Sequence, residues 1–177
     1  MKKALFIMLS AALIVCAAVA GTLAWLTDST GPVVNTFTVG DINITLTESQ
    51  NLDLKMVPGR TITKDPKVTV KEGSEACWLF VKVDKSVNFD SFMTFEMADG
   101  WIALSGHAGV YYRNVDATNA DTGFDVLKDN KVMVLETVTK TMLEGAKTNA
   151  PTLTFTAYAV QKDGINDATT AWGKVNP

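Results

Sequence analysis

The chain has 177 residues, of which 16 are Lys or Arg and 19 are Asp or Glu, so its formal net charge is −3. A mildly acidic chain with scattered lysines offers no basic stripe of the kind that phosphate binding requires, so the composition argues against nucleic acid as a partner. The length that remains after an N-terminal leader suits one domain with a sizeable hydrophobic core.

The first 24 residues differ from the rest of the chain and follow the pattern of an export signal. A short basic start, Met1-Lys2-Lys3, precedes the run 4–20, which is apolar apart from Ser10. This run is slightly short for a membrane span of about 20 residues, and small residues follow it. The pattern predicts a signal peptide over residues 1–24 ahead of a mature domain over residues 25–177. An uncleaved membrane anchor is the alternative.

The position of cleavage is open, because small residues precede both Gly21 and Trp25. Cys16 lies inside the export signal and is lost with it, whichever position is used. Cys77 is then the single cysteine of the mature chain, within an apolar run. We interpret it as a buried small hydrophobic residue, with a reactive thiol as the alternative.

From Val33 onward, segments with a strand pattern alternate with turn residues. In the segment 41–47 apolar and polar residues alternate, which is the period of a strand with one buried face. The run 77–83 is apolar at nearly every position, which predicts a central strand covered on both faces. Further strands are predicted at 67–71, 101–104, 109–112, 131–139 and 152–161, with a turn at 57–60.

Helical signals are few. The segment 87–97 fits either a short helix or a loop, and 118–126 is predicted to be a short connection with one turn of helix. A brief helix is predicted at 167–172, with Asn166 or Asp167 as its N-cap. Many short strands without a βαβ rhythm predict an all-β fold, a single antiparallel sandwich or barrel.

Candidate catalytic and metal-binding residues are scarce. His107 is the only histidine and lies in a Ser-Gly-His turn, where we interpret it as a solvated loop residue. One histidine supports neither a histidine-rich metal site nor a serine triad with a nucleophile elbow. The loop 116–123 is the best candidate for a Ca²⁺ site, with a solvated acidic loop as the alternative. We therefore expect no catalytic residues, no metal and no cofactor.

Two apolar clusters lie on either side of the Gly31-Pro32 break, within the segment 25–40. One interpretation is an edge strand that completes the domain's own sheet. The other is a pairing strand that adds to the open edge of another subunit. The residues that would form this strand are Trp25, Leu26, Val33, Val34, Asn35, Thr36 and Phe37.

The same stretch resembles the export signature of the TasA and camelysin family of Gram-positive proteins, which a SipW-type signal peptidase processes. The resemblance continues in Met56–Pro66, in the strand 155–161 and in Ala171-Trp172, but not between about Asn88 and Lys147. By this resemblance cleavage falls between Ala24 and Trp25. The residues of the signature are Gly21, Thr22, Ala24, Trp25 and Asp28, followed by Asn35-Thr36-Phe37-Thr38-Val39-Gly40.

The resemblance implies a secreted β-sandwich of jelly-roll type, found in the extracellular matrix of biofilms or at the cell surface. It implies a fibre subunit whose N-terminal strand completes the sheet of a neighbour, so its partners are copies of itself or related matrix subunits. The signal peptidase is a partner during export, and the membrane is contacted only through the uncleaved signal segment.

Two other functions stay open. Camelysin members have been described as surface metallopeptidases, although this chain lacks the histidine cluster that such an activity needs. The other is a monomeric surface module that binds a carbohydrate or a host ligand through Trp101, Tyr111 or Tyr112. The two adjacent tyrosines would point to opposite faces of a strand.

Overall fold

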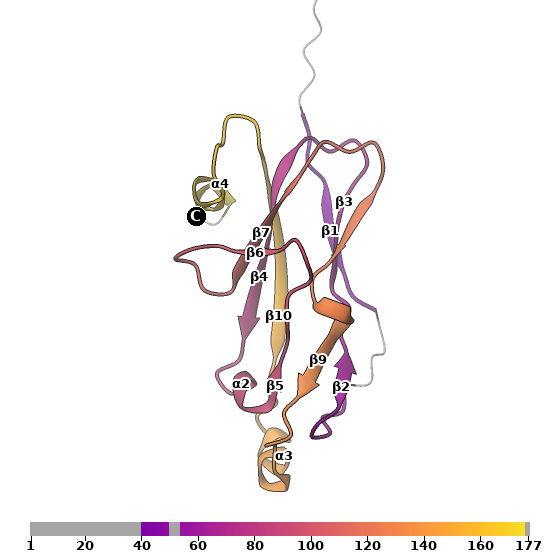
Figure 1. Cartoon of the computed structure of the whole chain (residues 1–177), viewed down its shortest axis with the longest axis vertical. Helices are drawn as coiled ribbons and strands as arrows, with labels where there is room; N and C mark the ends of the chain where they lie inside the picture. The colour runs from indigo at the N-terminus through magenta and orange to yellow at the C-terminus, as the bar shows by residue number, and fades with distance from the viewer. Residues whose placement is uncertain (1–39, 50–53, 176–177) are drawn as a thin grey trace, which may run out of the picture. The chain divides into compact units, whose positions relative to one another are not determined.

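The computed structural model describes residues 40–49 and 54–175 (Figure 1). The chain divides into two units, Met1–Thr38 and Val39–Pro177, and all described residues belong to the second. Several predictions fall on residues 1–39 and lie outside the described residues. They are the signal peptide, cleavage between Ala24 and Trp25, the export motif and the pairing strand.

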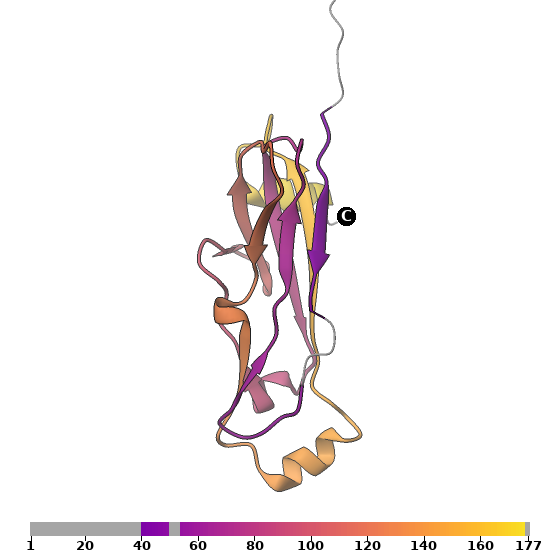
Figure 2. The same cartoon turned by 90° about the vertical axis from the view of Figure 1, so that its right-hand side faces the viewer.

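The described part is mostly β, with three small antiparallel sheets and three short helices (Figures 1 and 2), which confirms the antiparallel all-β prediction. The largest sheet has the order β10 (Leu153–Gln161), β4 (Cys77–Lys85), β7 (Val110–Val115) and β6 (Ile102–Ala103). The second sheet is β1 (Ile44–Thr47), β3 (Lys67–Val70) and β8 (Thr122–Asp125). The third sheet is β2 (Thr61–Thr63), β9 (Lys131–Val134) and β5 (Met93–Thr94).

The second and third sheets are consecutive stretches of one interrupted ladder. The break lies at residues 64–66 in one strand and at the longer stretch 126–130, with the 3₁₀ turn η1 (Lys128–Asn130), in the other. Backbone hydrogen bonds continue across it, since Val126 N donates to Pro66 O at 2.9 Å and Lys64 N donates to Asn130 O at 2.9 Å. Extra residues on one side form a bulge, which interrupts regular pairing without separating the strands.

The strand β4 is central and covered on both faces, as the sequence predicts. On one face Cys77, Leu79 and Val81 are fully buried, and they pack in one cluster with Val68 and Val70 of β3. The sheets that contain β3 and β4 therefore face each other across this cluster. Burial of alternate residues in β3 likewise confirms its predicted period of two.

The other face of β4 is covered by the C-terminal helix α4 (Ala168–Val175). The Nε1 of Trp78 donates to Ile165 O at 3.0 Å, and the ring centroids of Phe80 and Trp172 are 5.2 Å apart. Asp167 Oδ1 accepts a hydrogen bond from Thr170 N at 2.8 Å, which confirms Asp167 as the N-cap of the predicted helix.

A third cluster lies beneath the sheet β2-β9-β5. The helix α2 (Phe89–Phe92) leads directly into β5, so the undecided segment 87–97 holds both a short helix and a strand. The two phenylalanines of α2 are buried with Val132 and Val134 of β9. Ala146, in the helix α3 (Lys140–Ala146), belongs to the same cluster.

Two of the predicted elements, at 118–126 and at 131–139, are wrong. The segment 118–126 contains the strand β8, not a turn of helix, because Thr122–Asp125 pair along the whole of β3. The strand predicted at 131–139 ends at Val134, and α3 begins at Lys140. The Thr139 hydroxyl accepts a hydrogen bond from Met142 N at 3.3 Å, so this N-cap and the helix-forming residues that follow it were the missed signal.

Candidate functional site

The strands β1 and β10 lie beside each other, and among the described residues each has one edge without a partner strand. Within the described residues β1 pairs only with β3, and β10 pairs only with β4. The two strands lie side by side with no backbone pairing between them (Figure 2). We call the space between their unpaired edges the β1–β10 seam. Unpaired N–H and C=O groups at a sheet edge are a template for pairing with another chain.

The floor of the β1–β10 seam is apolar and incompletely covered. Ile42 and Ile44 from the β1 side and Phe155, Ala157 and Ala159 from β10 pack on the core between the sheets, yet all five stay half-buried. The alanines contribute little volume at this margin of the core. An added strand would therefore remove apolar surface from water as well as satisfy backbone groups.

The other lateral side of the two facing sheets is closed by large side chains. Trp101 is 9% exposed, and its Nε1 donates to Asp125 O of β8 at 2.8 Å. The guanidinium carbon of Arg113 lies 4.0 Å from the ring centroid of Phe124 and 5.3 Å from that of Trp101. Burial lowers the pKa of Arg113 from its ordinary value. The seam is thus the less covered of the two sides.

Two hollows mark the ends of the β1–β10 seam. The first, the Gly40 hollow, has a volume of about 530 Å³ and lies where Ile42 approaches Ala159. The second, the Leu46 hollow, has a volume of about 290 Å³ and lies where Leu46 approaches Phe155. The start of β1 therefore lies beside the end of β10, so the two strands run in opposite directions along the seam.

A third hollow, the Met56 groove, continues from the Leu46 hollow, since Lys64, Leu153 and Thr154 line both. Its volume is about 480 Å³, which lies within the range of pockets that bind side chains or small ligands. Its remaining walls are largely apolar. They include Leu54, Met56, Ile62, Phe89, Met93 and Pro151.

Lys64 stands where the Leu46 hollow meets the Met56 groove. Its Nζ lies 2.8 Å from Glu48 Oε1 and 5.5 Å from the ring centroid of Phe155, and its side chain is only 16% exposed. Next to this pair, Ser49 donates to Asp65 through its N–H at 3.0 Å and through its hydroxyl at 2.5 Å. These contacts hold the residues that follow β1 against the break between β2 and β3.

The pKa of the Asp65 carboxyl group is a measure of its hydrogen bonds with Ser49. Hydrogen bonds from Ser49 lower its pKa below the ordinary value of 3.8, so the ionised form stabilises the fold above that pH. This contribution is lost as the pH falls through the lowered value. In the variant Ser49→Ala we expect the Asp65 pKa to rise toward 3.8, measured by NMR titration of the carboxyl carbon. An unchanged pKa would show that the contact is not maintained in solution.

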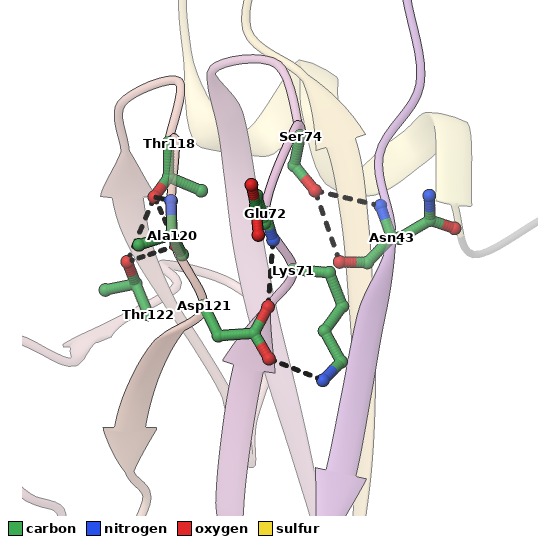
Figure 3. A network of polar contacts seen from close by, with 8 residues as sticks. All are labelled: Asn43, Lys71, Glu72, Ser74, Thr118, Ala120, Asp121 and Thr122. Carbon is green, nitrogen blue, oxygen red and sulfur yellow. Dashed lines mark hydrogen bonds and ion pairs between the residues drawn. The ribbon is translucent and has the colours of Figure 1, made fainter.

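The acidic loop 116–123 uses its polar groups in local contacts (Figure 3). Asp121 Oδ2 lies 2.7 Å from Lys71 Nζ, its Oδ1 accepts from Glu72 N at 3.0 Å, and the Lys71 contact is the main cause of its lowered pKa. The Thr118 hydroxyl donates to Ala120 O at 2.5 Å. Across residues 40–49 and 54–175, no group of three or more His, Cys, Asp and Glu side chains is placed to hold a metal ion.

The other candidate residues take part in packing. His107 lies in the turn between β6 and β7, but it is half-buried and meets Trp172 edge-on, with centroids 6.3 Å apart, so it is not simply solvated. Tyr111 packs on the core between the sheets and Tyr112 on the cluster beneath α4, which confirms their opposite directions. With Trp101 buried, these aromatic residues do not form one exposed platform.

Cys77 is buried, as expected, and burial raises the pKa of its thiol to about 11. The ordinary pKa of a thiol is 9.0, so the raised pKa lowers the thiolate fraction near pH 8 by about 100-fold. We expect iodoacetamide to alkylate the folded protein at least that much more slowly than the urea-unfolded chain, followed by mass spectrometry. Equal rates would place the thiol at the surface.

The seam is the part of the site that the sequence did not identify. The alternation in 152–161 marks one apolar face of β10, but no local signal places β10 at an edge beside β1. In the part of the chain that the structure describes, no helix has the length and apolar character needed to cross a membrane. Comparisons with protein-family models, with curated proteins and with solved structures gave no match to this chain.

Proposed function

We propose that this chain is an exported, non-enzymatic structural protein that assembles by strand addition. The segment 25–37 of one copy enters the β1–β10 seam of another copy or of a related subunit, and the assembly is a fibre at the cell surface or in an extracellular matrix. The signal-peptide pattern predicted for residues 1–24 and the resemblance of the export motif to the TasA and camelysin family support export.

The observation that carries this proposal is the seam itself. Among the described residues, two neighbouring strands leave facing edges unpaired above an apolar floor, while the other side of the two sheets is closed by Trp101 and Arg113. We infer that a strand placed there pairs with one of these edges and covers Ile44, Ala157 and Ala159. Main-chain pairing supplies affinity, and alternate side chains supply specificity.

The sequence of the segment 25–37 suits this position. Trp25, Leu26, Val33, Val34 and Phe37 supply apolar side chains for the floor and for the hollows at either end. Adding this strand would join the two facing layers of strands into one closed β-sandwich. We propose that this sandwich is of jelly-roll type.

The competing arrangement keeps the segment within its own chain. There it would turn back at Gly40 and Asp41 and occupy the seam beside its own β1, completing the domain's own sheet. A chain closed in this way stays a monomer at every concentration. The oligomeric state of the mature protein therefore separates the two arrangements.

The test compares the mature chain 25–177 with the shortened chain 38–177, by light scattering and negative-stain microscopy over a range of concentrations. We expect concentration-dependent assembly from the first and monomers from the second. A synthetic peptide of residues 25–38 should bind the shortened chain, and the same peptide with Phe37→Asp should bind at least 10-fold more weakly. If the mature chain stays monomeric under every condition, the fibre proposal fails.

A further inference from the structure

Arg113 is a half-buried cation that no acidic side chain of the described residues neutralises. The ion pairs in this part of the chain all use lysine. Its Nε is buried and has no acceptor among residues 40–49 and 54–175. Burial lowers the pKa of Arg113, and no neighbouring charge contributes to that shift. A charge removed from water without a partner is costly, so an anion at this side chain would stabilise it.

The guanidinium is held in one place by the groups around it. Its carbon lies 4.0 Å from the ring centroid of Phe124 and 5.3 Å from that of Trp101. A Cβ at Gly100 would lie 2.7 Å from Nη2, so the backbone of the turn before Trp101 lies close against the guanidinium. The two rings attract the cation but offer it no hydrogen-bond acceptor. The donors are therefore positioned in advance, which lowers the entropic cost of binding a ligand.

The edge formed by Nη1 and Nη2 is the part of the guanidinium that a ligand can reach, since Nε is the nitrogen of Arg113 that is enclosed. Two parallel N–H groups at such an edge match the two oxygens of a carboxylate. The site has one positive charge, and no second cation influences the pKa of Arg113. A carboxylate, with one negative charge, suits it better than a phosphate, which carries up to two.

We propose that Arg113 binds a singly charged carboxylate through Nη1 and Nη2, while Phe124 and Trp101 hold the guanidinium in position. The carboxylate belongs to a free organic acid or to a uronic acid unit of a polysaccharide, because the same two hydrogen bonds recognise both. This inference does not depend on strand addition, since Arg113 closes the lateral side of the sheets away from the β1–β10 seam.

The test observes the arginine Nε–H groups by NMR. Arg60 and Arg113 are the arginines of the chain, and Arg60 is exposed, so it is an internal control. The mature chain 25–177, labelled with ¹⁵N, is kept at pH 7 and below any concentration at which it assembles. Sodium acetate replaces sodium chloride at constant ionic strength, because salt screens charges. The variant Arg60→Lys assigns the two signals.

We expect the Arg113 signal to shift and saturate, with its midpoint at about 10-fold lower acetate concentration than for Arg60 or less, the gain from a charge-assisted hydrogen bond. Linear shifts of equal size for both arginines would overturn the inference, because they would report bulk solvent alone. Phosphate that saturates the Arg113 signal at lower concentration than acetate would overturn the assignment to a carboxylate.

The variant Arg113→Lys gives a second readout, since lysine keeps the charge but lacks the planar pair of donors. A ligand that binds the folded state raises the melting temperature. Acetate should therefore raise the melting temperature of the parent chain, relative to chloride, more than that of the variant. An equal rise in both would contradict a role for the planar edge. Circular dichroism confirms that the variant folds, and the NMR comparison does not require it.

The trimer of galacturonic acid separates the two sources of the carboxylate. If the trimer saturates the Arg113 signal at a lower concentration of carboxylate groups than acetate does, the ligand is a uronic acid polymer. Equal midpoints per carboxylate group identify a free organic acid. Because every arm is read on chains that are not assembled, failure of this inference leaves the proposed strand addition untouched.

Discussion

Replacing Trp172 by alanine is expected to lower the free energy of unfolding by about 3–5 kcal/mol, the usual cost of removing a large buried aromatic side chain. Trp172 is 2% exposed, and its ring centroid lies 5.2 Å from those of both Phe80 and Tyr158. It packs with Trp78, Phe80 and Tyr158 in the cluster between α4 and the outer face of β4 and β10. Its removal leaves a cavity that backbone pairing in the sheet prevents from collapsing.

The measurement is urea unfolding followed by circular dichroism, with Lys174→Ala as the matched control. Lys174 belongs to the same helix but is exposed, and changes at such positions usually stay within about 0.5 kcal/mol. A loss below about 1 kcal/mol for Trp172→Ala would mean that α4 is not held against the sheet in solution.

Replacing Gly109 by alanine is expected to cost about 2–3 kcal/mol in unfolding free energy. Gly109 has φ +76°, where a non-glycine residue costs about 1–2 kcal/mol. A Cβ at this position would also lie 2.6 Å from Val83 O. Relief of that contact would strain the hydrogen bond in which Val83 N donates to Gly109 O at 2.7 Å, a bond worth about 1 kcal/mol.

Gly106 provides the matched control for this prediction. It lies in the same loop between β6 and β7 with φ +77°, and a Cβ there would meet no atom within 4 Å. Gly106→Ala should therefore show only the conformational cost of about 1–2 kcal/mol. Thermal and urea unfolding of the two variants give the comparison. If both variants lose the same unfolding free energy, the close approach of Gly109 to Val83 of β4 contributes nothing to the cost of the Gly109 substitution.

The sequence by itself determined most of the individual strands. The alternation at 67–71 and the apolar run at 77–83 are set by which side chains must be buried, and the structure confirms both. The strand predicted at 152–161 is present as β10, but its residues 155–160 are half-buried on both faces. The Pro-Gly turn at 57–60, the capping Asp167 and the buried Cys77 are equally local. Each depends on a few neighbouring residues, so a short stretch of sequence contains the whole signal.

Only the tertiary structure decided which strands share a sheet and which edges stay unpaired. β8 has a weak strand pattern of its own, and it forms because β3 offers a partner along its whole length. The β1–β10 seam joins residues about a hundred positions apart, and Lys64 meets Glu48 and Phe155 there. Pairing between distant strands depends on the packing of the whole core, whereas local periodicity records only which face of each strand is buried.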